Sequence, residues 1–188
     1  AKNFPKFNRS IDVCGTGGDN LNMINVSTAV SLVLSCYDCV VLKHGNKAVS
    51  SQSGSSDVLV ELGVGLDIDN KILQNTASDL NIAFLNAPQF YPFLKKLAPI
   101  RKSLGIKTIL NLLGPLLNPS EIDYQLMGVY DRKYHPQLIS VLRKLNRKSA
   151  MIVTGFDNAD EISLSTDSYI TEYRNGKIKQ YTISPKVF

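Results

Sequence analysis

Short apolar runs, rich in β-branched residues, alternate with longer amphipathic stretches over the first half of the chain. The apolar runs predict strands and the amphipathic stretches predict helices, because each periodicity buries one face of its element. We expect strands at residues 10–14, 39–43 and 82–86, and helical stretches at residues 26–35, 55–62, 70–79 and 91–97. This alternation is typical of βαβ units and favours a mainly parallel sheet.

The pattern changes after a loop rich in turn residues at positions 114–119. A strand at residues 124–129, a helix at 135–145 and a strand at 150–154 continue the alternation. Residues 168–173 and 177–183 then flank Arg174-Asn175-Gly176, and Asn-Gly is a strong hairpin signal. The sequence therefore predicts an α/β fold in which a mainly parallel sheet, flanked by helices, ends in a C-terminal antiparallel hairpin. We expect one domain over residues 1–188.

The composition suits a chain that folds around an ordinary core. The 188 residues are 44% hydrophobic, enough for a sizeable core without disulfides or metal staples. No apolar run approaches the roughly 18 residues of a membrane helix, and the N-terminus lacks the apolar region of a signal peptide. We expect a cytoplasmic protein that does not enter a membrane.

The net charge of +5 permits binding to a polyanion. The Lys and Arg residues are scattered in singles and pairs, however, and no basic run is interleaved with aromatic residues. Attraction of a highly charged pyrophosphate substrate would account for part of the excess, and a solvated basic face for the rest. Nucleic-acid binding is the less favoured interpretation.

The cysteines and histidines offer little chemistry. Cys36 and Cys39 form a CxxC pattern with no second pair or nearby histidine to complete a zinc site, so we expect reduced thiols that fill space in a turn. His135, before a proline at an expected helix start, is predicted to lie on the surface. His44 fits either a structural histidine or a direct ligand contact.

Two loops have the composition of phosphate-binding segments. The strand at 10–14 runs into Gly15-Thr16-Gly17-Gly18-Asp19, where glycines let backbone N–H groups turn toward an anion at the start of the next helix. A second cluster follows one βα unit later, with Lys43, a point charge suited to phosphate, and hydroxyls at positions 50–56. Two such loops indicate one extended anionic ligand, such as a nucleotide sugar or a phosphoribosyl donor.

Asp160 and Glu161 are adjacent carboxylates just beyond the strand at 150–154. Ligands gather at the carboxyl ends of strands in open α/β sheets, and carboxylate oxygens suit Mg²⁺. Adjacent acids are also common on surfaces, so the residues alone fit a metal site or a solvated pair. Arg101 similarly fits a bidentate contact with a carboxylate ligand or an ordinary surface charge.

Seven segments carry a resemblance to a known family. In chain order they read GTGGD, NVST, KHGN, SSxSGSSDVLxELG, RKSLGIKTxxNxLGPLxNP, QLMGVYD and DEIS. Together they resemble the anthranilate phosphoribosyltransferase family, whose fold is of the nucleoside phosphorylase/phosphoribosyltransferase type. The resemblance implies magnesium-dependent transfer of phosphoribose from phosphoribosyl pyrophosphate to the amine of anthranilate, a step of tryptophan biosynthesis. Family members are longer and form homodimers, and we expect their helical domain to be largely absent here.

The resemblance also implies roles for particular residues. Those implied for phosphoribosyl pyrophosphate follow the first four motifs and are Gly15, Gly18, Asp19, Asn25, Val26, Ser27, Thr28, Lys43, His44, Gly45, Asn46, Lys47, Ala48, Val49, Ser50, Ser51 and Ser55. Anthranilate would contact Gly15, Asn46 and Arg101. Mg²⁺ would be held by Ser27, Asp160 and Glu161, and no further catalytic acid or base is implied, because pyrophosphate leaves readily once its charge is neutralised.

The sequence departs from the family pattern at several positions. Asn20 replaces a glycine, Met23 replaces a threonine and removes a hydroxyl, and Tyr91 replaces a histidine on the acceptor side. Lys47 and Lys107 replace arginines and lose the planar bidentate contact. These changes would alter donor affinity or the choice of acceptor.

Other interpretations remain beside an active transferase recorded in part. The chain fits a truncated relative with weak or no activity, or a homologue that binds nucleic acid. A pyrimidine nucleoside phosphorylase shares the fold class but does not account for RKSLGIKT or DEIS. An α/β half without its helical partner is also expected to expose apolar surface.

Overall fold

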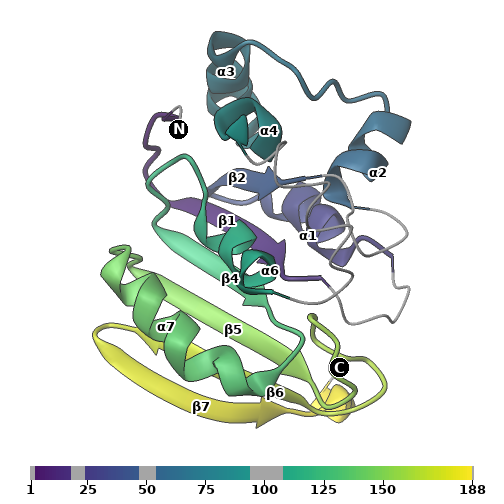
Figure 1. Ribbon diagram of the computed structural model, residues 1–188, viewed down its shortest axis with the longest axis vertical. Helices are drawn as coiled ribbons and strands as arrows, with labels where there is room; N and C mark the ends of the chain where they lie inside the picture. Colours follow the sequence, from purple (N-terminus) through teal and green to yellow (C-terminus); the bar gives the residue numbers. More distant parts are fainter. Residues whose placement is uncertain (1–2, 18–23, 47–53, 94–107, 188) are drawn as a thin grey trace.

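The computed structural model describes residues 3–17, 24–46, 54–93 and 108–187. Within these residues seven strands form one sheet in the order β3-β2-β1-β4-β5-β6-β7 (Figure 1). The strands are β1 Ser10–Gly15, β2 Val40–Gly45, β3 Ile82–Asn86, β4 Tyr124–Gly128, β5 Ser149–Gly155, β6 Ser168–Arg174 and β7 Lys177–Ile183. Strands β1 to β5 pair in parallel, whereas β6 and β7 are antiparallel. The predicted mainly parallel sheet with a C-terminal hairpin is confirmed.

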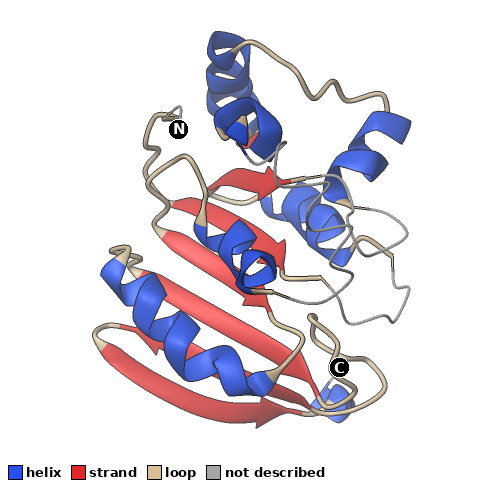
Figure 2. Ribbon diagram, viewed as in Figure 1, coloured by secondary structure: helices blue, strands red, loops and turns tan. Residues whose placement is uncertain are grey.

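Helices connect the strands in the order that the pattern predicts (Figure 2). They are α1 Val26–Leu34, α2 Ser55–Glu61, α3 Asn70–Leu80, α4 Ala87–Phe90, α6 Ile109–Leu113 and α7 His135–Lys144, with 3-10 turns η1 Gly114–Leu116, η2 Arg132–Tyr134 and η3 Pro185–Val187. The sequence did not predict α4 and α6, which are too short to show a helical period. Tyr91 caps the end of α4 instead of starting a helix, and most of the stretch predicted at 91–97 lies outside the described residues.

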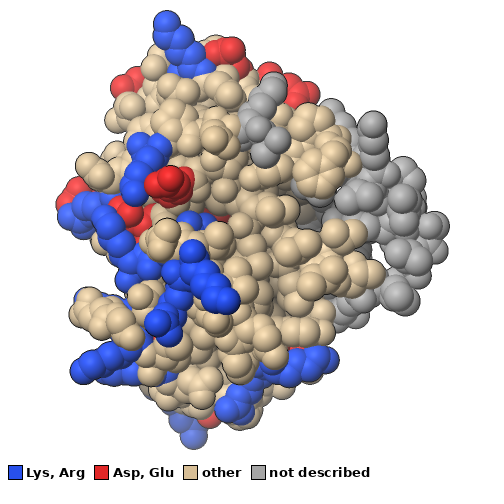
Figure 3. All heavy atoms as spheres, turned by 60° about the vertical axis from the view of Figure 1, so that its left-hand side comes forward, with Lys and Arg blue, Asp and Glu red and all other residues tan. Residues whose placement is uncertain are grey.

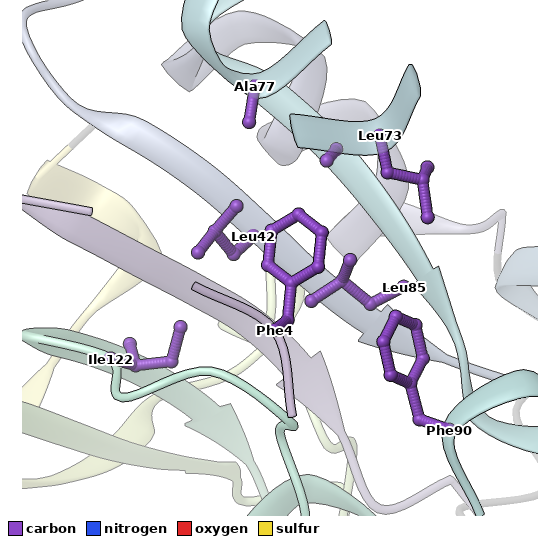
Figure 4. Close-up of a cluster of buried hydrophobic side chains, with 8 residues drawn as sticks. Phe4, Leu42, Leu73, Ala77, Leu85, Phe90 and Ile122 are labelled. Atoms are coloured by element: carbon purple, nitrogen blue, oxygen red, sulfur yellow. The ribbon is translucent and has the colours of Figure 1, made fainter. Parts of the chain in front are cut away.

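Helices cover both faces of the sheet, because successive side chains along each strand point to opposite faces. Leu42 of β2 packs with Leu73 and Ala77 of α3, and the same cluster holds Phe4 and Phe90 (Figure 4). The rings of Phe4 and Phe90 meet edge to face, 6.0 Å apart. Burying each such side chain contributes roughly 1.5–3 kcal/mol. This cluster fixes β2 and β3 beneath α3 and α4.

A second cluster lies under α7. Met127 of β4 and Ile152 of β5 are fully buried and pack against Leu138 and Leu142 of α7. The register pairs Met127 with both Ile152 and Cys14 of β1, so these side chains share one face of the sheet. α7 therefore covers β4 and β5 on the face that α3 covers over β2 and β3.

The opposite face carries α1. Lys43 follows Leu42 and so points to the other side of the sheet, where its ammonium group meets Ser27 of α1. Helix α1 buries the polar side chains Ser27, Thr28 and Ser31, whereas an ordinary surface helix buries its apolar face. Its apolar Leu32 and Val33 are 45% and 60% exposed. The expected exposed apolar surface is therefore found on α1.

Two expectations about single residues are wrong. His135 is 1% exposed, because α7 begins over β5 and β6 and turns its first side chain toward the sheet. Cys36 is exposed and Cys39 only half-buried, so the pair does not fill a buried space. The turn that follows α1 lies at the surface, where Asp38 pairs with Arg9.

Part of the positive charge lies far from the phosphate-type loops. Figure 3 shows basic side chains gathered along one margin of the face it presents, with acidic side chains beside them. Arg9 pairs with Asp38 at 2.6 Å, and Lys148 pairs with Asp123 at 2.9 Å, near the amino ends of the strands. The overall charge therefore does not mark a binding site by itself. None of the described helices combines the length and apolar character needed to cross a bilayer.

Candidate functional site

Four neighbouring parallel strands each end in glycine. Gly45, Gly15, Gly128 and Gly155 are the last residues of β2, β1, β4 and β5, which lie side by side in that order. The carboxyl ends of parallel strands meet at one edge of the sheet, where open α/β folds bind ligands. Because glycine has no Cβ, other segments approach the backbone closely along this row.

The segment after β1, residues 15–17, is tied to this edge; we call it the glycine loop. Thr16 donates its N–H to the Gly128 carbonyl at 3.0 Å, and its hydroxyl accepts from Tyr130 N at 3.3 Å. Gly17 has φ +63°, a conformation that favours glycine. Its N–H donates to Asp160 Oδ2 at 2.6 Å. The first predicted phosphate loop and the predicted carboxylate pair are therefore in contact.

Asp160 is 8% exposed and lies between two strand ends. A Cβ on Gly15 would overlap its carboxylate oxygen, and a Cβ on Gly128 would overlap its carbonyl group. Glu161 follows directly, and its charge acts on the buried Lys43. The two acids predicted beyond the last parallel strand thus lie at the glycine row. Among the described residues, no cluster of three or more His, Cys, Asp and Glu side chains forms a metal site.

Ser27 and Lys43 form another side of the candidate site, beside the glycine row. Asn25 caps α1 by accepting from Thr28 N at 3.2 Å, which places Ser27 in the first turn. Lys43 is 2% exposed and donates to Val13 O at 2.7 Å and to Ser27 Oγ at 2.9 Å. Burial lowers the pKa of Lys43, and the nearby charges of Asp12 and Glu161 oppose that shift. This lysine fixes the Ser27 hydroxyl from within.

Sequence reasoning missed Asp12, which supports both Lys43 and His44. Its Oδ1 accepts from His44 N at 3.2 Å and its Oδ2 from Asn118 Nδ2 at 2.9 Å. Burial raises the pKa of Asp12 to about 6, although the Asn118 hydrogen bond and the Lys43 charge oppose the shift. A carboxylate inside an apolar strand was the available signal, because burial of Asp requires partners.

Buried polar atoms without hydrogen-bond partners lie over the same half of the sheet. They are Thr28 Oγ1, His44 Nε2, Asn86 Oδ1 and Gln89 Oε1 within the described ranges. Burial lowers the pKa of His44 to about 4, so the imidazole is neutral, and its ring lies 5.9 Å from that of Tyr91. Buried polar groups are normally paired, so each of these atoms could form a hydrogen bond with a ligand that reaches it.

The second loop joins α2 close to the glycine row. Ser56 N donates to Asn46 O at 3.4 Å, and a Cβ on Gly45 would lie 3.3 Å from Ser55 Cβ. A pocket between β2, β3 and α2 is lined by Lys43, Gly45 and Ser55, together with Phe84 and Asn86. Residues 47–53, between Asn46 and Gly54, lie outside the described residues.

The structure describes twelve of the residues implied for the site and brings them to this edge of the sheet. They are Gly15, Asn25, Val26, Ser27, Thr28, Lys43, His44, Gly45, Asn46, Ser55, Asp160 and Glu161. The others, Gly18, Asp19, Lys47, Ala48, Val49, Ser50, Ser51 and Arg101, lie outside the described residues.

Comparison with known proteins identifies the family. The family model described as "Glycosyl transferase family, a/b domain" matches residues 8–188. The chain belongs to this glycosyl transferase family. A family of this kind is consistent with a polar site at the carboxyl ends of the strands.

Similar proteins narrow the family further. Over 176 residues, 94% of this chain, the glycosyl transferase domain is 48% identical to the anthranilate phosphoribosyltransferase of Clostridium beijerinckii. It is 44% identical over 180 residues, 96% of the chain, to the enzyme of the same name from Caldicellulosiruptor saccharolyticus. The chain spans 52% and 53% of these two proteins, about half their length. The resemblance inferred from the sequence is confirmed for the region that matches.

Two solved structures share the fold of this glycosyl transferase domain. Anthranilate phosphoribosyltransferase from Thermus thermophilus superposes with a TM-score of 0.89 at 33% identity, covering 99% of this chain and 55% of that one. The Saccharomyces cerevisiae enzyme in complex with PRPP, which is phosphoribosyl pyrophosphate, and Mg superposes with a TM-score of 0.88 at 29% identity. That match covers 98% of this chain and 51% of the yeast chain.

Proposed function

We propose that this chain is the donor-binding α/β domain of an anthranilate phosphoribosyltransferase, which transfers phosphoribose from phosphoribosyl pyrophosphate to the amine of anthranilate. The supporting observation is the contact between the glycine loop and Asp160, opposite the Ser27–Lys43 pair. A chain with the same fold has been solved in complex with PRPP and Mg. The product would be phosphoribosylanthranilate, an intermediate of tryptophan biosynthesis, with release of pyrophosphate.

The oxygen donors at the site fit Mg²⁺. This ion prefers hydroxyl, carboxylate and phosphate oxygens, and it is usually held by one or two carboxylates together with substrate phosphates. Ser27 Oγ is held in place by Lys43, and Asp160 by the Gly17 amide. We propose Ser27, Asp160 and Glu161 as the residues that would hold the metal. When bound, Mg²⁺ would neutralise the charge of the leaving pyrophosphate.

The protein groups have complementary parts in this proposal. The N–H groups of Thr16 and Gly17 already donate to protein oxygens, so the backbone donors proposed for phosphate are those of Gly18 and Asp19, which lie outside the described residues. Lys43 would act through Ser27, because both of its described hydrogen bonds end on protein atoms. Breaking the bond between pyrophosphate and C1′ develops positive charge on the ribose. Holding donor and amine together supplies much of the rate, so no strong base is needed.

We propose that anthranilate, the acceptor, contacts Gly15, Asn46 and His44. Gly15 ends β1 beside the buried carboxylate, and Asn46 follows the end of β2. His44 lies one residue before the end of β2, its lowered pKa keeps the imidazole neutral, and its Nε2 has no hydrogen-bond partner among the described residues. Arg101, implied for the anthranilate carboxylate, lies outside the described residues. Anthranilate and phosphoribosyl pyrophosphate are therefore the proposed small-molecule substrates.

The proposal is tested by the loss of anthranilate fluorescence in the presence of phosphoribosyl pyrophosphate and Mg²⁺. The variant Asp160→Asn, Glu161→Gln keeps the shape of both side chains and removes their charge. We expect it to lose transfer activity by about a hundredfold or more, since removing charges that stabilise a leaving group costs several kcal/mol. The control Glu121→Gln removes an exposed acid that pairs only with the exposed Lys6 among the described residues, and is expected to keep full activity.

Two results would contradict the proposal. One is transfer that continues at the same rate when Mg²⁺ is chelated. The other is equal activity of the double variant and the Glu121→Gln control, which would place the donor elsewhere on the chain.

A further inference from the structure

The loop that carries the two acids, residues 156–163, rests on strand ends that lack side chains; we call it the carboxylate loop. Its neighbours at the glycine row are Gly15, Gly128 and Gly155. A Cβ on Gly128 would lie 2.5 Å from the carbonyl carbon of Asp160 and closer still to its oxygen. Backbone, unlike the end of a long side chain, cannot move aside cheaply, so only glycine is compatible with this approach.

Gly155 forms the second support. A Cβ there would overlap the Asp157 carboxylate and would lie 3.1 Å from Ala159 Cβ and 3.2 Å from Ser163 Cβ. The loop contacts Gly155 with three residues at once, whereas Gly128 receives only the Asp160 backbone. Neither glycine has a positive φ, so close approach rather than backbone conformation requires glycine at these positions.

Asp160 moves together with the rest of the carboxylate loop, because hydrogen bonds within the loop hold its residues in place relative to one another. Gly155 N donates to Ala159 O at 2.9 Å, and Asp157 accepts from Ala159 N at 3.1 Å and from Ser163 Oγ at 2.8 Å. Ser163 N in turn donates to Ser168 Oγ of β6 at 2.9 Å. A displacement at either glycine therefore moves Asp160 with the loop.

We infer that Gly128 and Gly155 are positioning residues that hold the carboxylate loop against the strand ends, so that Asp160 bonds the Gly17 amide and fixes the glycine loop for donor binding. The consequence for donor binding rests on the proposed function. The Asp160–Gly17 bond itself does not, since it joins two protein groups. The motif QLMGVYD, which contains Gly128, thereby acquires a role.

The first readout is the Gly17 amide in the NMR spectrum of the ¹⁵N-labelled chain. An N–H that donates to a carboxylate at 2.6 Å has a strongly downfield proton signal. We expect Gly128→Ala and Gly155→Ala to shift this signal upfield, as Asp160→Ala does. Gly65→Ala is the matched control, because its Cβ would make only an ordinary contact with Ile68 at 3.5 Å, and it should leave the signal unchanged.

The second readout is calorimetric affinity for phosphoribosyl pyrophosphate at saturating Mg²⁺. Loss of a supporting contact around metal ligands typically costs 10–100-fold, so we expect affinity to fall by about tenfold or more in Gly128→Ala and Gly155→Ala. An unshifted Gly17 amide in both variants would overturn the inference, as would wild-type donor affinity in both. A wild-type chain that shows the amide signal but binds no donor would overturn the proposed function and leave the support of Asp160 standing.

Gly15→Ala keeps the inference testable if Gly128→Ala does not fold. At Gly15 the overlap is with the Asp160 side chain rather than the backbone, so Asp160→Ala relieves it. We expect the double variant to bind the donor no more weakly than Asp160→Ala alone, because both changes break the same contact. Fully additive losses would overturn the inference.

Discussion

The two halves of the sheet treat buried polar groups differently. Around β1 to β3, four buried side-chain atoms lack a hydrogen-bond partner, on Thr28, His44, Asn86 and Gln89. Around β4 to β7, the described residues contain none. Both halves hold buried charged side chains, Lys43 and Asp12 in the first and Asp123 and Arg147 in the second. An unpaired buried group costs about 1–3 kcal/mol, so the first half is the less favourable half for the protein alone.

The two histidines, His135 and His44, show the same difference between the halves, because one is fully hydrogen-bonded and the other is not. His135 is bonded at both nitrogens, with Nδ1 2.9 Å from Thr171 Oγ1 and Nε2 2.9 Å from Thr154 Oγ1. Thr154 donates its own proton to Val129 O, so it accepts from His135 Nε2–H, and Nδ1 accepts from Thr171. His44 has the same lowered pKa, about 4, but its Nε2 has no partner.

This contrast separates support from site. A fully paired network rigidifies the elements that it joins, whereas unpaired groups that persist in a buried position require another explanation, such as a ligand. Strands β4 to β6 and α7 thus form the support, which ends in the carboxylate loop. Strands β1 to β3 and α1 hold the unpaired groups, and under the proposed function these would face the donor.

Lys43→Met tests the first half with the largest expected effect. The change leaves Val13 O and Ser27 Oγ without the donor that Lys43 supplies, and it removes a positive charge that favours the ionised form of Asp12. A buried polar atom without its partner costs about 1–3 kcal/mol, so we expect a total loss of about 2–5 kcal/mol in chemical denaturation. The control Lys6→Met breaks an exposed pair with Glu121 and should cost below about 1 kcal/mol. Equal losses would contradict a stabilising role for the two buried hydrogen bonds of Lys43.

The variant His135→Gln tests the second half of the sheet through the pH dependence of its stability. Burial holds the pKa of His135 at about 4, below the 6.5 of the unfolded chain. Between these values the unfolded state binds the proton, so stability is full above pH 6.5 and falls as the pH drops toward 4. The shift corresponds to about 3 kcal/mol. We expect the stability of the variant, measured by denaturation at each pH, to fall less over this window.

Asp12 has the opposite effect in the same experiment. Its pKa is raised from 3.8 to about 6, so it contributes stability at low pH that is lost as the pH rises through this range. The test of His135 is therefore the difference between variant and wild type. A difference that does not change between pH 6.5 and 4 would mean that folding does not lower the pKa of His135.

His44→Gln sharpens the comparison with a smaller effect on stability. Only one side of this ring is bonded to the protein, through the backbone of Gly114, so we expect a loss of about 1 kcal/mol. Binding of anthranilate, measured by fluorescence titration in the presence of donor, should weaken severalfold. If the His135→Gln variant weakened binding more than His44→Gln, the assignment of support and site would be reversed.

Cys36→Ser is expected to have the smallest effect. The thiol is exposed and contacts only the Leu32 carbonyl at 3.8 Å. Stability should change by less than about 0.5 kcal/mol, and the metal dependence of donor binding should not change. A changed metal dependence would indicate that the CxxC pattern of Cys36 and Cys39 binds a metal.

Much of the fold could be predicted because each parallel strand is a short apolar run between turn signals. The strand at 82–86 was placed at its observed bounds, and Asn175-Gly176 located the hairpin. The helices α4 and α6 escaped because each spans little more than one turn. The position of His135 escaped because the inward turn of a helix depends on the neighbouring strands, which a local pattern does not contain.

The candidate site could be predicted in its polar residues but not in its supports. The glycine loop was named from its composition and Asp160 from the family resemblance, whereas their contact at 2.6 Å is known only from the structure. The glycines that end β4 and β5 gave no local signal, since their importance lies in a backbone that approaches from elsewhere in the chain. Asp12 had a local signal as a carboxylate inside an apolar strand, but its partner Asn118 is more than a hundred residues away and could not be named from the sequence.

The most direct test of the account is calorimetric titration of this chain with phosphoribosyl pyrophosphate at several Mg²⁺ concentrations, beside the variant Asp160→Ala, Glu161→Ala. The account predicts binding that strengthens with Mg²⁺ in the wild-type chain and is lost in the variant. Binding that is absent at every Mg²⁺ concentration, or equal in the two proteins, would contradict the assignment of this edge of the sheet as the donor site.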